Sequence, residues 1–333
     1  MVQFGNPANM GFCIACFLRD TAGALGLHTA AKVQYIRPEI IGLVIGAAAI
    51  SLCTKEFRPR GGSSPMTRFI LGFLVMIGCL VFLGCPLRMV IRIGGGDLNA
   101  ILGLVGFIVG IVPGVFFLHK GYSLKRTCNL TASEGISFSL IQIILLILLL
   151  AAPAFIFFSA GGPGSQHALA GFSLVAGIIV GILAQKTRLC MVGGIRDLIM
   201  FKENRLILGF LAILAAVLIG NACVSNLHFG FAEQPIAHTD GLWNFLGMAV
   251  VGFGSTLLGG CPLRQLISAG EGNADSAITI LGLVAGAAFA HNFGLASSAE
   301  GATLNGKVAV IIALIVLFII AAVHTNWKGE QSS

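Results

Sequence analysis

The string GCPLR stands at residues 84–88 and again, unchanged, at residues 260–264. Each copy follows a long apolar run and precedes a glycine-rich segment and a further apolar run. Two identical strings in such similar settings indicate an internal repeat. The repeat places a thiol, a helix-breaking proline and a cation at two related points of the chain.

The repeat is wider than this string. Further matching segments are FC at 12–13 with LC at 189–190, RD at 19–20 with RD at 196–197, and ILGLV at 101–105 with ILGLV at 280–284. Each half therefore consists of a short cysteine segment, two apolar spans, the GCPLR segment and two more spans. We place the first repeat at residues 1–160 and the second at residues 161–333.

The composition indicates a membrane protein. Hydrophobic residues make up 56% of the chain and charged residues 10%, with 45 glycines among 333 residues. A soluble domain carries about 25% charged residues, and small residues suit close helix packing in lipid. The net charge of +7 is not accompanied by a basic run interleaved with aromatic residues, so it favours cationic loops over nucleic-acid binding.

The apolar runs predict an all-α polytopic membrane protein with about nine spanning helices, because roughly 20 apolar residues cross a bilayer. Runs such as Ile141–Leu150 show none of the alternation that is typical of a β-barrel. The second repeat has one span before its first cysteine segment, whereas the first repeat has none, and residues 1–10 resemble the tail of such a helix. The predicted spans are 36–54, 67–84, 98–119, 138–160, 168–185, 203–222, 241–259, 275–292 and 307–323.

Loop charges predict the orientation. Lys and Arg gather in one set of loops and are absent from another, and cytoplasmic loops are the ones enriched in these residues. The C-terminus is then cytoplasmic, while Arg19, Lys32 and Arg37 run against the pattern. The basic loops are 55–68, 120–134 and 186–205, and the loops without Lys or Arg are 161–167, 223–240 and 293–306.

This orientation turns the second repeat over relative to the first, since a complete repeat has five spans, an odd number. Inverted repeats that meet at a pseudo-two-fold axis are typical of transporters, which have broken helices near the bilayer midplane. The proline after each GCPLR cysteine ends the preceding helix, and the glycines at 94–96 and 270–272 let the chain turn back. We therefore expect two short re-entrant helices that enter from opposite faces.

Four of the nine cysteines occupy positions that the repeat relates: Cys13 with Cys190, and Cys85 with Cys261. We expect these four to be functional. By contrast, Cys53, Cys79 and Cys223 fit the role of small apolar residues in helices. Cys16 and the loop cysteine Cys128 stay undecided.

No metal site or cofactor is expected. Cys13-x-x-Cys16 is a single CxxC, and its counterpart reads Cys190-x-x-Gly193. A structural zinc site needs four nitrogen or sulfur ligands at fixed spacings, and no such set is apparent.

Arginines follow each of the four related cysteines: Arg88, Arg264, Arg19 and Arg196. A cation within the bilayer is tolerated when it faces a cavity or pairs with an acid. These side chains either attract an anion or form structural ion pairs. Asp20 and Asp197 directly follow two of the arginines, and neighbours on a helix are not expected to face each other. The acids near the GCPLR segments offer other partners: Glu271, Asp275 and Asp97.

The strings GFCIACFLRDTAGALGLH, RLCMVGGIRDL and GGCPLRQLISAGEGN resemble the YeeE/YedE sulfur-transport family, and most closely its YedE branch of selenium transporters. The resemblance implies uptake of thiosulfate or a selenium species along a path lined by cysteine thiols. The matching thiols here are Cys13, Cys85, Cys190 and Cys261. The GCPLR string differs from the GCGNK-like string of the thiosulfate transporters, which leaves the substrate open between the two.

The sequence thus predicts an inner-membrane transporter or channel for a small sulfur- or selenium-containing anion, and not an enzyme. The other partners are membrane lipid and, by resemblance, a cytoplasmic TusA-like sulfur-carrier protein. Two alternatives stay open. One is a membrane thiol enzyme, which needs a thiolate and a nearby resolving thiol. The other is a scaffold that hands sulfur or selenium to the carrier protein.

Overall fold

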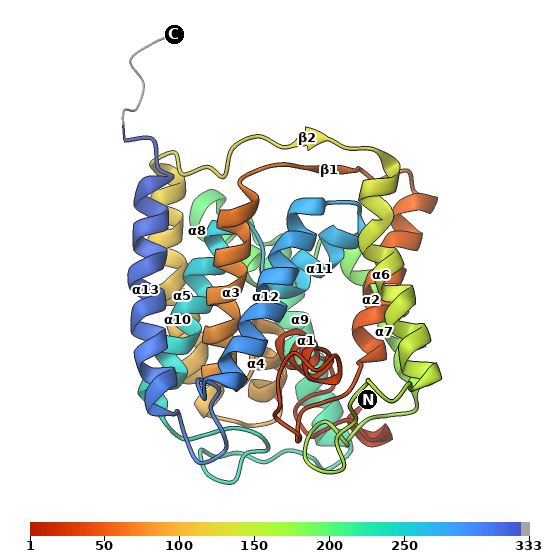
Figure 1. The fold of residues 1–333 in the computed structure, drawn as a ribbon. Helices are drawn as coiled ribbons and strands as arrows, with labels where there is room; N and C mark the ends of the chain where they lie inside the picture. The colour runs from red at the N-terminus through yellow and green to blue at the C-terminus, as the bar shows by residue number, and fades with distance from the viewer. Residues whose placement is uncertain (328–333) are drawn as a thin grey trace.

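The structure is a computed structural model that describes residues 1–327, and its regular secondary structure is almost entirely helix (Figure 1). Eight segments are long and apolar enough to span a membrane, and α2 is a shorter apolar helix of 16 residues. The prediction of an all-α polytopic membrane protein is confirmed. The long helices are α2 (Pro38–Cys53), α3 (Pro65–Phe82), α5 (Asn99–His119), α6 (Ala132–Ala151), α7 (Ala170–Thr187), α9 (Arg205–Cys223), α10 (Gly241–Leu257), α12 (Ala274–Asn292) and α13 (Leu304–Val323).

Short elements complete the described chain. Four helices of 9 or 11 residues each lie directly after a cysteine: α1 (Ile14–Ala24), α4 (Pro86–Gly94), α8 (Met191–Phe201) and α11 (Pro262–Gly270). The first residues, which resembled the tail of a helix, hold a single 3₁₀ turn at Val2–Phe4. Two-residue strands β1 (Arg60–Gly61) and β2 (Cys128–Asn129) form an antiparallel pair.

One predicted span is wrong at both ends. The span expected at 138–160 is α6, which begins six residues earlier and ends at Ala151. Thr131 and Glu134 form a capping box that starts the helix ahead of its apolar run. Ala152 then adopts the left-handed conformation and Pro153 follows, and a proline cannot continue a helix.

The core lies where α3 and α10 pack against each other, with α12 against α3 and α5 against α10. Under the predicted repeat, α3 corresponds to α10 and α5 to α12, so these are the contacts that two copies of one fold would make. By contrast, α9 buries a single residue, Phe210. The boundary of the repeats at residue 160 stays a prediction.

Glycines allow the two equivalent helix crossings. A Cβ added at Gly110 of α5 would lie 2.1 Å from the carbonyl oxygen of Ala249 in α10. A Cβ added at Gly282 of α12 would lie 2.1 Å from the oxygen of Phe69 in α3. Backbone cannot yield as a flexible side chain can, so both crossings require glycine at these points.

The basic loops meet at one end of the molecule, which we call the basic end (residues 54–64, 120–131, 188–190 and 324–327). There β1 pairs with β2, the Ser123 amide donates to the His324 oxygen (3.2 Å), and Arg188 pairs with Glu56 (3.2 Å). Figure 1 shows β1, β2 and the start of the C-terminal segment together at the top. The opposite end consists of residues 25–37, 152–169, 224–240 and 293–303.

Candidate functional site

Each of the four repeat-related cysteines is the N-cap of one short helix: Cys13 of α1, Cys85 of α4, Cys190 of α8 and Cys261 of α11. All four have extended backbone at the cap, and none is more than 5% exposed. A helix N-terminus carries a partial positive charge and unpaired amide groups. The sequence therefore puts one buried thiol at the electropositive end of each short helix.

The short helices predicted after the GCPLR strings are present as α4 and α11, and each begins with the proline of its string. A proline at the first helical position costs no hydrogen bond, because that amide has no partner within the helix. The chain turns back at Gly96 and Gly272, whose φ angles of 96° and 95° are in the left-handed region. In Figure 1, α11 lies in the half near β1 and β2, and α4 in the opposite half.

The sulfur atoms of the first cysteine of each repeat accept a backbone hydrogen bond from within the helix they cap. The Cys16 amide donates to the Cys13 sulfur (3.4 Å), and the Gly193 amide donates to the Cys190 sulfur (3.2 Å). This contact occurs at the same position in both repeats. It fixes where each thiol lies at the end of α1 or α8.

The sulfur atoms of the GCPLR cysteines face the first turn of a neighbouring short helix as well as their own. Cys85 lies beside the Cys13 thiol and the backbone amide of Ala15. In the second repeat, the sulfurs of Cys190 and Cys261 are 3.9 Å apart, and Cys261 also faces the amide of Met191. The four thiols therefore form two pairs, one in each repeat.

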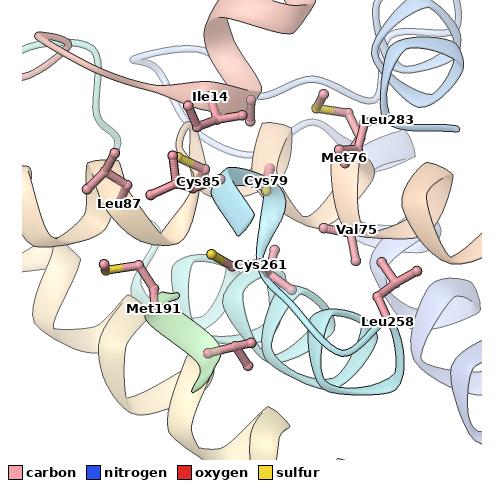
Figure 2. Packing of buried hydrophobic residues seen from close by; sticks show 14 of the residues in the cluster. Ile14, Val75, Met76, Cys79, Cys85, Leu87, Met191, Leu258, Cys261 and Leu283 are labelled. Atoms are coloured by element: carbon pink, nitrogen blue, oxygen red, sulfur yellow. The ribbon is translucent and has the colours of Figure 1, made fainter. Parts of the chain in front are cut away.

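These pairs lie within the buried core of the molecule. Figure 2 shows Cys85 and Cys261 in one apolar cluster, with Cys79 also in it. Thiols that are shielded from water, beside helix N-termini, offer weak and polarisable donors to an anion without requiring a full counter-charge. We call Cys13, Cys85, Cys190 and Cys261 the thiol pairs.

The remaining cysteines divide by burial. Cys16 and Cys79 are fully buried beside Cys13, so they belong to the same cluster. In the sequence, Cys16 stands out because it lies one helical turn after Cys13. Cys79 resembles an ordinary small apolar residue of a helix. Cys53, Cys128 and Cys223 are exposed. Within residues 1–327, no three His, Cys, Asp or Glu side chains converge as a metal site would require.

Arg88 of the first GCPLR string is wholly buried and is held by protein atoms on every nitrogen. Its guanidinium donates to the backbone oxygens of Asn9 (3.1 Å), Leu83 and Ile236 (3.1 Å). It also donates to the Cys16 sulfur (3.4 Å). A guanidinium with so many fixed acceptors has little capacity left for a passing ligand.

Arg264 of the second string is held differently. It donates to Glu271 through Nη2 (2.9 Å), and its buried Nη1 has no partner. Of the three acids expected near these arginines, Glu271 is thus a partner. Asp97 pairs with Arg92 (2.6 Å) instead, and Asp275 accepts from the amides of the basic-end loop at 62–63.

Arg19 and Arg196 each pair with the aspartate that follows them, which corrects the expectation that helix neighbours do not meet. The distances are 2.6 Å for Arg19–Asp20 and 2.7 Å for Arg196–Asp197. An arginine side chain is long enough to fold back on its neighbour. Asp20 also binds Arg37 (2.7 Å), so two of the three cations that opposed the predicted orientation share one buried acid.

Replacing Asp20 with Asn is expected to lower the free energy of unfolding by about 3–5 kcal/mol, because it leaves two buried arginines without their charge partner. The thermal midpoint of helix loss in detergent measures the effect. Asp197→Asn is the matched control: it removes the repeat-related acid from a partly exposed pair, where the cost is about 1 kcal/mol. Equal shifts in the two variants would contradict this interpretation.

Cavities open toward the two ends of the molecule. At the opposite end, a cavity of about 620 Å³ is lined by Arg19, Lys32 and Leu83 among others. At the basic end, a cavity of about 250 Å³ is lined by Glu56, Arg58, Arg60, Arg188, Glu271 and Asn273. Leu83 is two residues before Cys85, and Arg188 two before Cys190. The thiol pairs therefore lie near a cavity at each end, and none of their residues lines either one.

A polytopic helical protein with short, cysteine-capped helices and a cationic cavity near either end has the features of a membrane transport protein. The family model described as Sulphur transport matches residues 186–331. This part of the chain, which contains the second thiol pair, is similar to the sulfur-transport family that the model describes. The match supports the family expected from the sequence motifs.

A relative of known activity agrees with this family. A segment of 108 residues is 32% identical to the thiosulfate transporter TsuA of Escherichia coli (strain K12). The segment covers 32% of this chain and 30% of that relative, so less than a third of either protein is matched. Both comparisons are with transporters, in agreement with the prediction that the chain is not an enzyme.

Proposed function

We propose that the protein imports a small sulfur anion, with thiosulfate as the first candidate, along a path that passes the two thiol pairs. The observation that carries the proposal is the placement of all four repeat-related cysteines as buried N-caps of short helices. The sulfur-transport family and the thiosulfate-transporting relative support this class of substrate.

The chemistry of the thiol pairs suits such an anion. Thiosulfate carries a polarisable terminal sulfur, and a thiol is a weak donor that can hydrogen-bond it without binding it tightly. The four helix N-termini supply positive potential in place of full charges. Two successive pairs of weak sites allow an anion both to enter and to leave, as conduction requires.

The orientation belongs to the same proposal. Most Lys and Arg side chains gather in the loops of the basic end, whereas at the opposite end Arg19 and Arg37 are paired with Asp20 and Lys32 is exposed. Cytoplasmic loops are enriched in such cations. We place the basic end and the C-terminus in the cytoplasm and the protein in the bacterial inner membrane, so that import runs from the cavity at the opposite end to the cavity at the basic end.

Uptake of radiolabelled thiosulfate into proteoliposomes tests the function. We expect uptake above that of protein-free liposomes, and we expect unlabelled thiosulfate to compete while sulfate competes weakly. Selenite and selenide are added as further competitors, because a selenium species suits the same polarisable donors. Thiosulfate uptake no higher than that of protein-free liposomes would contradict the proposal.

A sulfur-carrier protein is a further partner under this proposal. It would take the anion at the basic end, where the exposed loop residues Lys55 and Arg126 offer contacts of positive charge. Binding of a purified TusA-like carrier to the wild-type protein and to a Lys55→Glu, Arg126→Glu variant measures this. Equal binding by the two proteins would mean that these loop residues do not contact the carrier.

A further inference from the structure

The cavity at the basic end is built largely from charged side chains. Three arginines, Arg58, Arg60 and Arg188, face two acids, Glu56 and Glu271, around about 250 Å³ of space. The cations outnumber the acids, so the cavity favours an anion. Its volume is sufficient for a small oxyanion with part of its hydration shell.

Glu271 is shared between two arginines. Its Oε2 accepts from Arg264 Nη2 (2.9 Å), and its Oε1 accepts from Arg188 Nη1 (3.3 Å). Each arginine thus gives this acid a single nitrogen and not the bidentate fork that holds an arginine–carboxylate pair most firmly. The carboxylate occupies the place between two guanidinium groups that an oxyanion would take.

Glu56 binds the other terminal nitrogen of Arg188, Nη2. Its Oε2 accepts from Arg188 Nη2 (3.2 Å) and from the Gln185 amide (2.6 Å). The hydrogen bond from Gln185 lowers the pKa of Glu56, and the charges of Lys186 and Arg188 lower it further. Glu56 therefore stays ionised and gives Arg188 a second acceptor.

Both arginines retain capacity for a ligand. The Arg188 side chain is 49% exposed, and the buried Nη1 of Arg264 has no partner. Arg188 lies two residues before Cys190, and Arg264 three residues after Cys261. Both guanidinium groups therefore belong to the segments that carry the second thiol pair.

We propose that Glu271 is the internal counter-ion of an anion-release site at the basic end, and that it competes with the transported anion for Arg188 and Arg264. The inference rests on the proposed function for the identity of the anion. An arriving anion displaces Glu271 from the two arginines. The return of Glu271 then expels the anion into the cytoplasm, which keeps the site from holding its ligand.

Equilibrium dialysis of labelled thiosulfate against the purified protein in detergent tests the site apart from transport. Glu271→Gln removes the competing charge and keeps the shape, so thiosulfate should bind about tenfold more tightly, while saturated uptake into proteoliposomes becomes slower. Arg188→Gln should weaken binding about tenfold, because hydrogen bonds to charged groups are the stronger ones. Lys125→Gln, which removes a cation from an exposed loop of the same end, should bind as the wild type does.

Unchanged or weaker binding by Glu271→Gln would overturn the proposal, as would unchanged binding by Arg188→Gln or a wild-type protein that binds neither thiosulfate nor sulfate. Only variants that elute from size exclusion as the wild type does are compared. If Glu271→Gln fails this criterion, Glu271→Asp replaces it: its shorter side chain cannot reach both arginines, so binding should again tighten. Tighter binding together with absent wild-type uptake would contradict the proposed function and leave the counter-ion site standing.

Discussion

Replacing Cys261 with alanine is expected to lower the initial rate of thiosulfate uptake by about tenfold to hundredfold. The variant removes one thiol of a pair whose sulfurs are 3.9 Å apart. A lost hydrogen bond to a charged group costs about 1.5–3 kcal/mol, which corresponds to this range of rate if the barrier at the pair rises by that amount. Cys85→Ala should have a similar effect in the other repeat. Uptake into proteoliposomes at a substrate concentration below saturation measures both.

The exposed cysteines supply the controls. Cys53→Ala and Cys223→Ala remove a thiol from the surface of α2 or α9, so uptake should stay at the wild-type rate. The thiol path would be wrong if Cys85→Ala and Cys261→Ala also kept that rate. It would also be wrong if the controls lost uptake to the same extent as the two path variants.

Replacing Gly110 with leucine is expected to prevent folding. The first atom of the new side chain would lie 2.1 Å from the Ala249 oxygen at the crossing of α5 and α10, where neither backbone has room to move. Extra methylenes in a packed core cost about 1–3 kcal/mol, and a backbone collision at the central crossing exceeds that range. The yield of monodisperse protein after detergent extraction measures the result.

Gly220→Leu is the matched control for this substitution. Gly220 also lies within a long helix, α9, but a Cβ there would meet no atom within 4 Å. The control should be extracted in wild-type yield. Wild-type yield for Gly110→Leu would mean that α5 and α10 do not cross as closely as the structure shows.

Much of the helical framework could be predicted from the sequence, because long apolar runs have few alternatives in a membrane. Each of the nine expected spans coincides with a helix, and the short helices after the GCPLR strings are present. The error at α6 has a local cause. Its first turn is polar and is started by the Thr131–Glu134 capping box, which an apolar count does not register.

The site could be predicted only in part. The repeat selected the four cysteines, but only the fold shows that Cys190 and Cys261, far apart in the chain, bring their sulfurs within 3.9 Å. Arg88 and Arg264 each end the same string, GCPLR. Their different partners come from distant segments, such as Asn9 and Ile236 around Arg88, and no local pattern encodes these contacts.

The unequal settings of the two GCPLR arginines have a consequence for flux. A path with perfect two-fold symmetry would carry an anion equally well in either direction at matched concentrations. Arg88 is fixed by backbone oxygens, whereas Arg264 shares a carboxylate that a ligand can replace. Under our proposal the two ends of the path then differ in their affinity for the anion. Transport would still end at the same equilibrium between the two sides of the membrane. The anion concentration that saturates transport would, however, differ between the two ends of the path. At high concentrations the flux in one direction would then exceed the flux in the other.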